Sequence, residues 1–160
     1  MRRWTVGGAL IRGEEGLLLV CNRRRDQSLE WTPPGGVIDP GESVLGGLAR
    51  EVLEETGLVV ASWGDRSYTV VVEAPDMGWQ LRVEAWEALS VRGDLAIADP
   101  DGIVEQARFV AGGDAVGLLA ASPPWVHVPV GDWLGGGVQD AYRFALRGTQ
   151  RRAEAVERLL

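Results

Sequence analysis

The chain has 160 residues, of which 46% are hydrophobic, and a formal net charge of −7 at pH 7. This length and composition suit one ordinary domain with a substantial core, so we expect residues 1–160 to form a single domain. The excess of acidic residues argues against a general nucleic-acid-binding surface, which needs a basic face. It also means that a phosphate-bearing ligand would need cations in order to approach.

The basic and sulfur-containing residues exclude several further kinds of catalytic or structural site. All sixteen basic residues are Arg, and the absence of Lys excludes Schiff bases and the phosphate-binding lysine of Walker-type loops. The single cysteine, Cys21, excludes an internal disulfide, and its place in an apolar run predicts a buried strand thiol. No apolar run of eighteen residues is present and the apolar start turns polar at Arg12, so we expect a soluble, cytoplasmic protein that does not contact a membrane.

The first part of the chain is expected to form strands. Residues 4–11 and 16–22 predict a hairpin closed by a turn at Gly13–Glu15. The three arginines that follow, at positions 23–25, open a polar loop that is either simply solvated or in contact with phosphate or ribose. Residues 31–36 then predict a short extended segment whose glycines let the backbone pass close to a ligand.

A helix is predicted over residues 43–56, ending at Gly57, a residue typical of a helix C-terminus. At 100° per residue one face is apolar and packs on a core; it comprises Val44, Leu45, Leu48, Ala49 and Val52. The adjoining face carries Glu51, Glu54 and Glu55 at i, i+3 and i+4, with no Lys or Arg interleaved. This pattern is compatible with a solvated acidic helix or with a site for Mg²⁺, which carboxylates and substrate phosphates hold together.

The complete pattern over residues 36–58, called the box below, resembles the signature of the Nudix hydrolases. All of its fixed positions are filled, by Gly36, Glu42, Arg50, Glu51, Glu54, Glu55, Gly57 and the apolar Leu58. The resemblance implies the Nudix fold, an α/β/α sandwich with a central mixed β-sheet. It also implies that Glu51, Glu54 and Glu55 hold Mg²⁺, with Mn²⁺ as a substitute, and that the backbone of Gly36 adds a ligand. Glu42 and Arg50 would organise the loop, with Arg50 able to bridge to Glu42.

The remainder of the chain predicts strands followed by helices. Residues 58–62, 68–74 and 80–91 are expected to be strands, with a tight turn at Pro75–Gly78 between the last two. A short strand over 105–110 and a helix over 113–121 follow, and residues 125–130 are expected to be extended. Two helices, over 138–146 and 153–160, are expected to complete a mixed sheet that is covered on both faces.

Family members often use one more acidic residue, after the central strands, as a metal ligand or catalytic base. Glu105 is the preferred candidate here, ahead of Asp101 and Glu84. His127, the only histidine, is either a base or, more simply, a structural residue. The seven Trp are expected in the core or at interfaces, although some could stack on a ligand.

The resemblance implies hydrolysis of a phosphoanhydride bond in a nucleoside diphosphate linked to another moiety X. The residues expected to carry the catalysis are Arg50, Glu51, Glu54, Glu55 and Glu105. Either ADP-ribose or a noncanonical or oxidised nucleoside triphosphate is compatible with the residues outside the box, where Pro75 weakly favours ADP-ribose. The partner is then a small nucleotide, and a homodimer is compatible with the sequence. The alternative is a nucleotide-sensing module without catalysis, but such modules usually have a degraded box.

Overall fold

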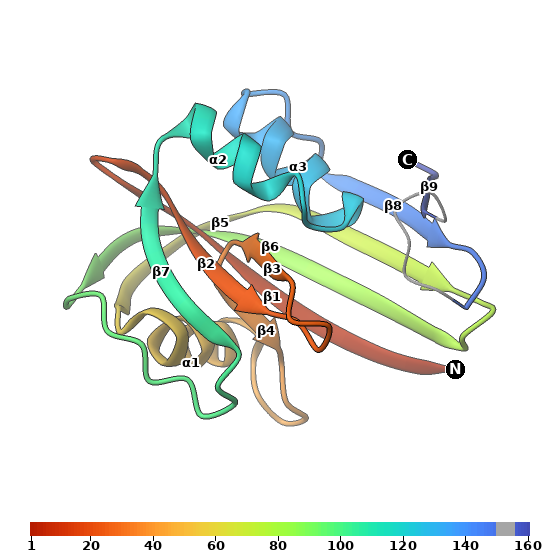
Figure 1. Cartoon of the computed structure of the whole chain (residues 1–160), viewed down its shortest axis with the longest axis horizontal. Coiled ribbons are helices and arrows are strands. Elements are labelled where there is room, and N and C mark those ends of the chain that lie inside the picture. The colour runs from red at the N-terminus through yellow and green to blue at the C-terminus, as the bar shows by residue number, and fades with distance from the viewer. Residues whose placement is uncertain (150–155) are drawn as a thin grey trace.

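The computed structural model describes residues 1–149 and 156–160, which form a mixed sheet with helices on both sides (Figure 1). The elements, in chain order, are β1 (Arg2–Gly13), β2 (Gly16–Arg23), β3 (Leu29–Thr32), β4 (Gly35–Val37), α1 (Val44–Thr56), β5 (Val59–Ala74), β6 (Trp79–Arg92), β7 (Val104–Val110), α2 (Gly112–Leu119), α3 (Pro124–Leu134), β8 (Ala141–Leu146) and β9 (Val156–Arg158).

The strands follow the order β3-β2-β1-β6-β5-β8-β9, with β4 paired to β1 and β7 paired to β2. The sheet is mixed because β1 runs parallel to β6 and β5 parallel to β8, whereas the β1–β2 and β5–β6 pairs are antiparallel. The predicted hairpin of β1 and β2 is confirmed, as is the tight turn between β5 and β6.

Two apolar cores lie on opposite faces of this sheet. The larger one packs Val130 and Trp133 of α3 and residues of α2 against Val70, Val72 and their neighbours. The smaller one packs Leu48 and Val52 of α1 against Ala9, Ile11 and Leu18. Figure 1 shows α1 on one side of the sheet and α2 and α3 on the other, which confirms the expected α/β/α sandwich. In the part of the chain that is described, no helix is long and apolar enough to span a membrane.

The expectation of two separate strands over 58–62 and 68–74 is wrong, because one strand, β5, runs through both. Residues 63–67 contain Gly, Asp and Arg and therefore look like a turn in the sequence. In the fold they stay paired with β6, and register shifts between Val60 and Tyr68 absorb the irregular stretch.

Two further predictions are wrong in the type of element: one segment that was expected to be extended is helical, and one that was expected to be helical is a strand. Residues 125–130 are helical, in α3, which begins at Pro124, where a missing N–H costs no hydrogen bond. Residues 141–146 form a strand, β8, which pairs with β5 and alternately exposes and buries its first side chains, Ala141 to Phe144.

The predicted helix over 153–160 is wrong for its described part, because residues 156–158 pair with β8 as β9. Residues 153–155 of that prediction lie outside the described residues. Both C-terminal segments, β8 and β9, are strands because they pair with the sheet, and no pattern in their own sequence predicts this.

Candidate metal and catalytic site

Helix α1 places the acidic side chains of the box, and its limits agree with the prediction. Ser43 caps the N-terminus, where its hydroxyl accepts the N–H of Gly46 at 3.0 Å. Gly57 ends the helix in the left-handed conformation at φ 79°, and its N–H donates to the carbonyl of Leu53. Leu48 and Val52 are fully buried against the sheet, so packing holds the helix despite the poor helix formers Gly46 and Gly47.

Gly47 has a packing role. A Cβ at this position would lie 2.9 Å from Cδ1 of Ile38 and 3.0 Å from Oε1 of Glu42. The absence of a side chain therefore lets the box loop lie directly on the first turns of α1.

Glu55 and Glu51 are the more buried acids of the face. Glu55 is only 6% exposed, and burial, opposed only in part by the Gly35 N–H that donates to its Oε1 at 2.8 Å, raises its pKa to about 8. Burial also raises the pKa of Glu51, and the charge of Glu54 adds to both effects. Two carboxyl groups thus lie where their own negative charges are poorly solvated.

Arg50 lies among these acids, although no Lys or Arg is interleaved with them on the helix face. Its Nη1 lies 3.1 Å from Glu51 and 3.5 Å from Glu54. Its Nε and Nη2 bind both carboxylate oxygens of Glu42, at 2.9 and 2.8 Å, as predicted from the sequence. This pair, together with the Asp39 N–H, lowers the pKa of Glu42 to about 2. One guanidinium thereby fixes the loop and orients two acids.

Gly36 and Glu51, which the resemblance assigns to one metal site, lie against each other. A Cβ on Gly36 would lie 2.7 Å from the carboxyl carbon of Glu51, so the acid rests directly against the glycine backbone. Gly36 itself pairs with Gly7, as β4 runs antiparallel to β1. The sheet therefore fixes the backbone against which Glu51 lies.

This group of oxygens fits a hard divalent cation in its chemistry. Within residues 1–149 and 156–160, no three His, Cys, Asp or Glu side chains are already arranged around a common point for a metal ion. Glu51 and Glu54 instead share Arg50, and Glu55 accepts the Gly35 N–H, which leaves a net negative charge in a partly buried place. Mg²⁺ prefers such oxygen donors, so the residues that would hold it are Glu51, Glu54 and Glu55.

A further acid lies near the box in the turn before β7. The segment after β6 is attached to α1, because the N–H groups of Ala96 and Ala98 donate to the carbonyls of Thr56 and Glu54. The charge of Asp101 contributes to the raised pKa of Glu51, and that of Asp99 to the raised pKa of Glu55. Because Asp99 accepts three backbone N–H groups of its own turn, Asp101 is the acid of this turn available to the box.

Glu105, the acid that was expected to act as a metal ligand or catalytic base, pairs with an arginine outside the box. Its carboxylate forms an ion pair with Arg23, with Nη2 at 2.8 Å from Oε2, and this arginine lowers its pKa. Glu84 in turn lies 3.7 and 3.6 Å from Arg66 and Arg82. None of the described contacts of Glu105 or Glu84 reaches the box, so a role of Glu105 in metal binding stays a prediction. The signal for Asp101 was present in the sequence, as an acid in an Asp-Pro-Asp-Gly turn.

His127 lies on α3, on the other side of the sheet from α1, and burial lowers its pKa. The imidazole is thus far from the box acids, as its structural interpretation expects. Cys21 is buried on β2, as predicted.

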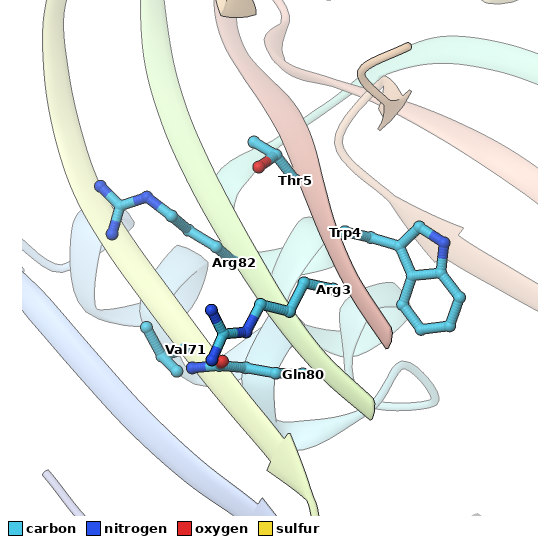
Figure 2. A pocket seen from close by; sticks show the side chains of 6 residues that line it. All are labelled: Arg3, Trp4, Thr5, Val71, Gln80 and Arg82. Carbon is cyan, nitrogen blue, oxygen red and sulfur yellow. The ribbon is translucent and has the colours of Figure 1, made fainter. Parts of the chain in front are cut away.

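A cavity of about 270 Å³ opens on the sheet near the box loop (Figure 2). Its lining residues come from three neighbouring strands and are Arg3, Trp4 and Thr5 of β1, Val71 of β5, and Gln80 and Arg82 of β6. Figure 2 shows the side chains of Arg3 and Gln80 side by side, whereas the indole of Trp4 points away from them. The carbonyl of Thr5 accepts the N–H of Ile38 at 2.9 Å, so the cavity and the box loop meet at β1.

Comparison with known proteins gives consistent results. Residues 1–133 match the family model described as the NUDIX domain. A protein of Mycobacterium tuberculosis named putative 8-oxo-dGTP diphosphatase 2 is 45% identical over 65 residues, which cover 38% of this chain and 45% of that protein. A putative 8-oxo-dGTP diphosphatase of Bacillus subtilis is 43% identical over 54 residues, or 34% of this chain and 36% of that protein. The matches thus span less than half the length of these relatives.

Solved structures share the fold. The mutator MutT protein from Bacillus halodurans aligns with a TM-score of 0.69 at 21% identity, over 98% of this chain and 95% of that one. A MutT protein from Methanosarcina mazei aligns with a TM-score of 0.59 at 27% identity, over 72% and 82% of the two chains. The arrangement of the sheet and helices is therefore common to this chain and to those proteins.

Proposed function

The chain belongs to the Nudix family, and we propose that it hydrolyses, with a divalent metal ion, a phosphoanhydride bond in a nucleoside diphosphate linked to a moiety X. The observation that carries this proposal is the group of Glu51, Glu54 and Glu55 on one face of α1, beside the backbone of Gly36. A degraded box would favour a nucleotide-sensing module, whereas every acid and the organising arginine are present here.

The roles of the residues follow from their contacts. Glu51, Glu54 and Glu55 would hold the cation, which when bound would neutralise the diphosphate and lower the pKa of a water. Arg50 holds Glu51 and Glu54 in place and is itself fixed by Glu42. Such positioning is most of what phosphoryl transfer requires from a protein.

The reaction joins one water to the substrate. A bond forms between the water oxygen and a phosphorus atom, the bond from that phosphorus to the bridging oxygen breaks, and two phosphate products leave. The proton of the water passes to a carboxylate, for which a box glutamate and Glu105 are the candidates.

The cavity on β1, β5 and β6 is suited to the nucleoside. Arg3, Arg82 and Gln80 offer hydrogen-bond donors, and Gln80 and Thr5 also offer acceptors, as the polar edge of a nucleobase requires. The names of the relatives from M. tuberculosis and B. subtilis favour a nucleoside triphosphate, in particular an oxidised one, over ADP-ribose. We therefore place such triphosphates first among the substrates.

Residues 134–160 are proposed to belong to the same domain as the matched residues. β8 pairs with β5 over Thr69 to Glu73, and β9 continues the sheet from β8. A separate unit would not share a sheet with the remainder of the chain.

The test is a panel of substrates incubated with Mg²⁺, Mn²⁺ or a chelator. Nucleoside triphosphates, 8-oxo-dGTP and ADP-ribose would be followed by phosphate release and by the mass of the products. Metal-dependent cleavage of a phosphoanhydride is the expected result. Binding of a nucleotide that is recovered intact in the presence of metal would instead identify a sensing module.

A further inference from the structure

The arginine loop consists of Arg23, the last residue of β2, and residues 24–28, which connect β2 to β3, and it borders a second cavity. This cavity has a volume of about 420 Å³ and is lined by Arg23, Arg24, Arg25, Gln27, Gly102 and Ile103. None of these lining residues is acidic, although the chain as a whole carries a net charge of −7. Three guanidinium-bearing residues thus line one cavity in an acidic protein.

Two of the three arginines already have acidic partners. Arg23 forms an ion pair with Glu105, and Arg24 forms one with Glu30, which is only 8% exposed. Arg25 is exposed and, among the residues that the structure describes, it contacts no carboxylate. Its guanidinium therefore keeps its donors available for a ligand.

The loop holds Arg25 in a defined backbone conformation. The N–H of Arg24 donates to the carbonyl of Ser28 at 2.8 Å, and the N–H of Gln27 donates to the carbonyl of Arg24 at 2.9 Å. Gln27 has a φ of 69°, the only positive φ of a residue other than Gly within the described ranges. Strain of this kind persists only where the surroundings enforce it, and it is frequent where a ligand is clamped.

The turn of residues 99–102 lies between the second cavity and helix α1. Ala98 donates its N–H to the carbonyl of Glu54 at 3.0 Å, and the next residues form a turn in which the Gly102 N–H donates to the carbonyl of Asp99. The ends of such a turn lie within about 7 Å of each other. Gly102, on the rim of the cavity, is therefore close to the helix that carries the acidic cluster.

We propose that Arg25 and the cavity beside it bind the terminal phosphate of a nucleoside triphosphate, so that the moiety X is a phosphate and not an uncharged sugar. The inference rests on the proposed function, because it assumes that the anhydride lies at the box. The turn of residues 99–102 adjoins the helix of the acidic cluster on one side and the cavity on the other, so a phosphate chain held at the box would extend toward the cavity that Arg25 lines. There the planar guanidinium is suited to bind two phosphate oxygens at once.

The experiment compares Arg25→Ala and Arg25→Lys with the wild-type protein on dGTP and on ADP-ribose, both with Mg²⁺. In parallel, binding of inorganic triphosphate with Mg²⁺ is measured by calorimetry. We expect Arg25→Ala to raise KM for dGTP and Kd for inorganic triphosphate by about tenfold, with kcat unchanged within about twofold. The ADP-ribose parameters should stay unchanged, and Arg25→Lys should recover part of the loss.

Arg143→Ala is the matched control. Arg143 lies on β8, which three strands separate from β2, and it is half-exposed beside Glu73. Removing the same charge there should leave triphosphate binding as it was.

The inference is overturned if Arg25→Ala changes dGTP and ADP-ribose to the same extent, or changes neither. It is also overturned if the wild-type protein does not bind inorganic triphosphate or cleaves ADP-ribose alone. Arg25-dependent binding of triphosphate by a protein that cleaves no nucleotide would refute the proposed function and leave only the phosphate site at Arg25 supported.

Discussion

The acidic cluster on α1 and the arginine loop between β2 and β3 are opposite in charge and in construction. In the cluster, Glu51 and Glu54 share one arginine, and Glu51 and Glu55 are buried enough that their pKa values rise. In the loop, two of three arginines are paired on the surface and the third is free among the described residues. The cluster is therefore suited to bind a cation and the loop to bind an anion. A substrate that carries a metal ion on its phosphate chain needs both.

The contrast also concerns how firmly each region is held. The acids sit on a helix that is capped at both ends and packed on a core, so their spacing is rigid. The arginine loop is held by its own hydrogen bonds and by surface ion pairs. We therefore expect changes in the cluster to alter catalysis strongly, and changes in the loop to alter substrate choice more mildly.

The largest expected effect comes from neutralising the cluster. Glu54→Gln and Glu55→Gln should each lower kcat by at least about a hundredfold while the protein stays folded, because each removes a charge that the cation would contact. Steady-state kinetics with Mg²⁺ and circular dichroism would measure this. Glu73→Gln, an exposed acid on β5, is the matched control; a Glu54→Gln/Glu55→Gln double variant with wild-type turnover would contradict the assignment of the metal site.

The buried charge of Glu55 should also appear in the stability of the metal-free protein. Its pKa is about 8 in the folded state and near 4.5 when unfolded, so between these pH values the folded state holds more protons. The free energy of unfolding should therefore fall as the pH rises from about 5 to 8, by about 3 kcal/mol. Urea unfolding in a chelator at both pH values would measure this fall.

Two additions sharpen the stability measurement. Glu55→Gln should remove most of the fall, since the amide does not ionise, and Mg²⁺ should stabilise the wild-type protein more at pH 8 than at pH 5. An equal fall in the wild-type protein and in Glu55→Gln would show that another group causes it.

A third change disturbs the cluster without removing a charge. Gly36→Ala would bring a Cβ within 2.7 Å of the Glu51 carboxyl group and push that side chain away, and we expect kcat to fall by about tenfold. Gly8→Ala is the control, because a Cβ at this position of β1 meets nothing within 4 Å. Equal kinetics for the two variants would mean that the contact between Gly36 and Glu51 does not matter.

The smallest expected effect concerns Asp101 and Glu105, the two acids outside the helix, and it distinguishes their roles. We expect Asp101→Asn to lower kcat by about fivefold and Glu105→Gln by less, because only Asp101 lies close enough to Glu51 to influence its pKa. Kinetics of both variants at saturating Mg²⁺ would rank them. A larger loss in Glu105→Gln would instead make Glu105, and not Asp101, part of the site.

The box was predictable in detail because its determinants are local. Helix periodicity aligns Glu51, Glu54 and Glu55, Ser43 and Gly57 end the helix, and the pairing of Arg50 with Glu42 follows from their spacing. Strands β1, β2 and β6 were predictable for the same reason, as apolar runs bounded by turn residues.

Contacts between distant segments decided the rest. The sequence alone did not determine that β5 runs through its polar middle, that β8 and β9 are strands, or that Arg50 also reaches Glu51 and Glu54. Likewise, Asp101 came near the box, and Glu105 came to Arg23, only through the attachment of residues 96–98 to α1 and the pairing of β7 with β2. A residue's neighbours along the chain determine a helix face, whereas its neighbours in space determine which charge it meets, and those follow from the tertiary structure.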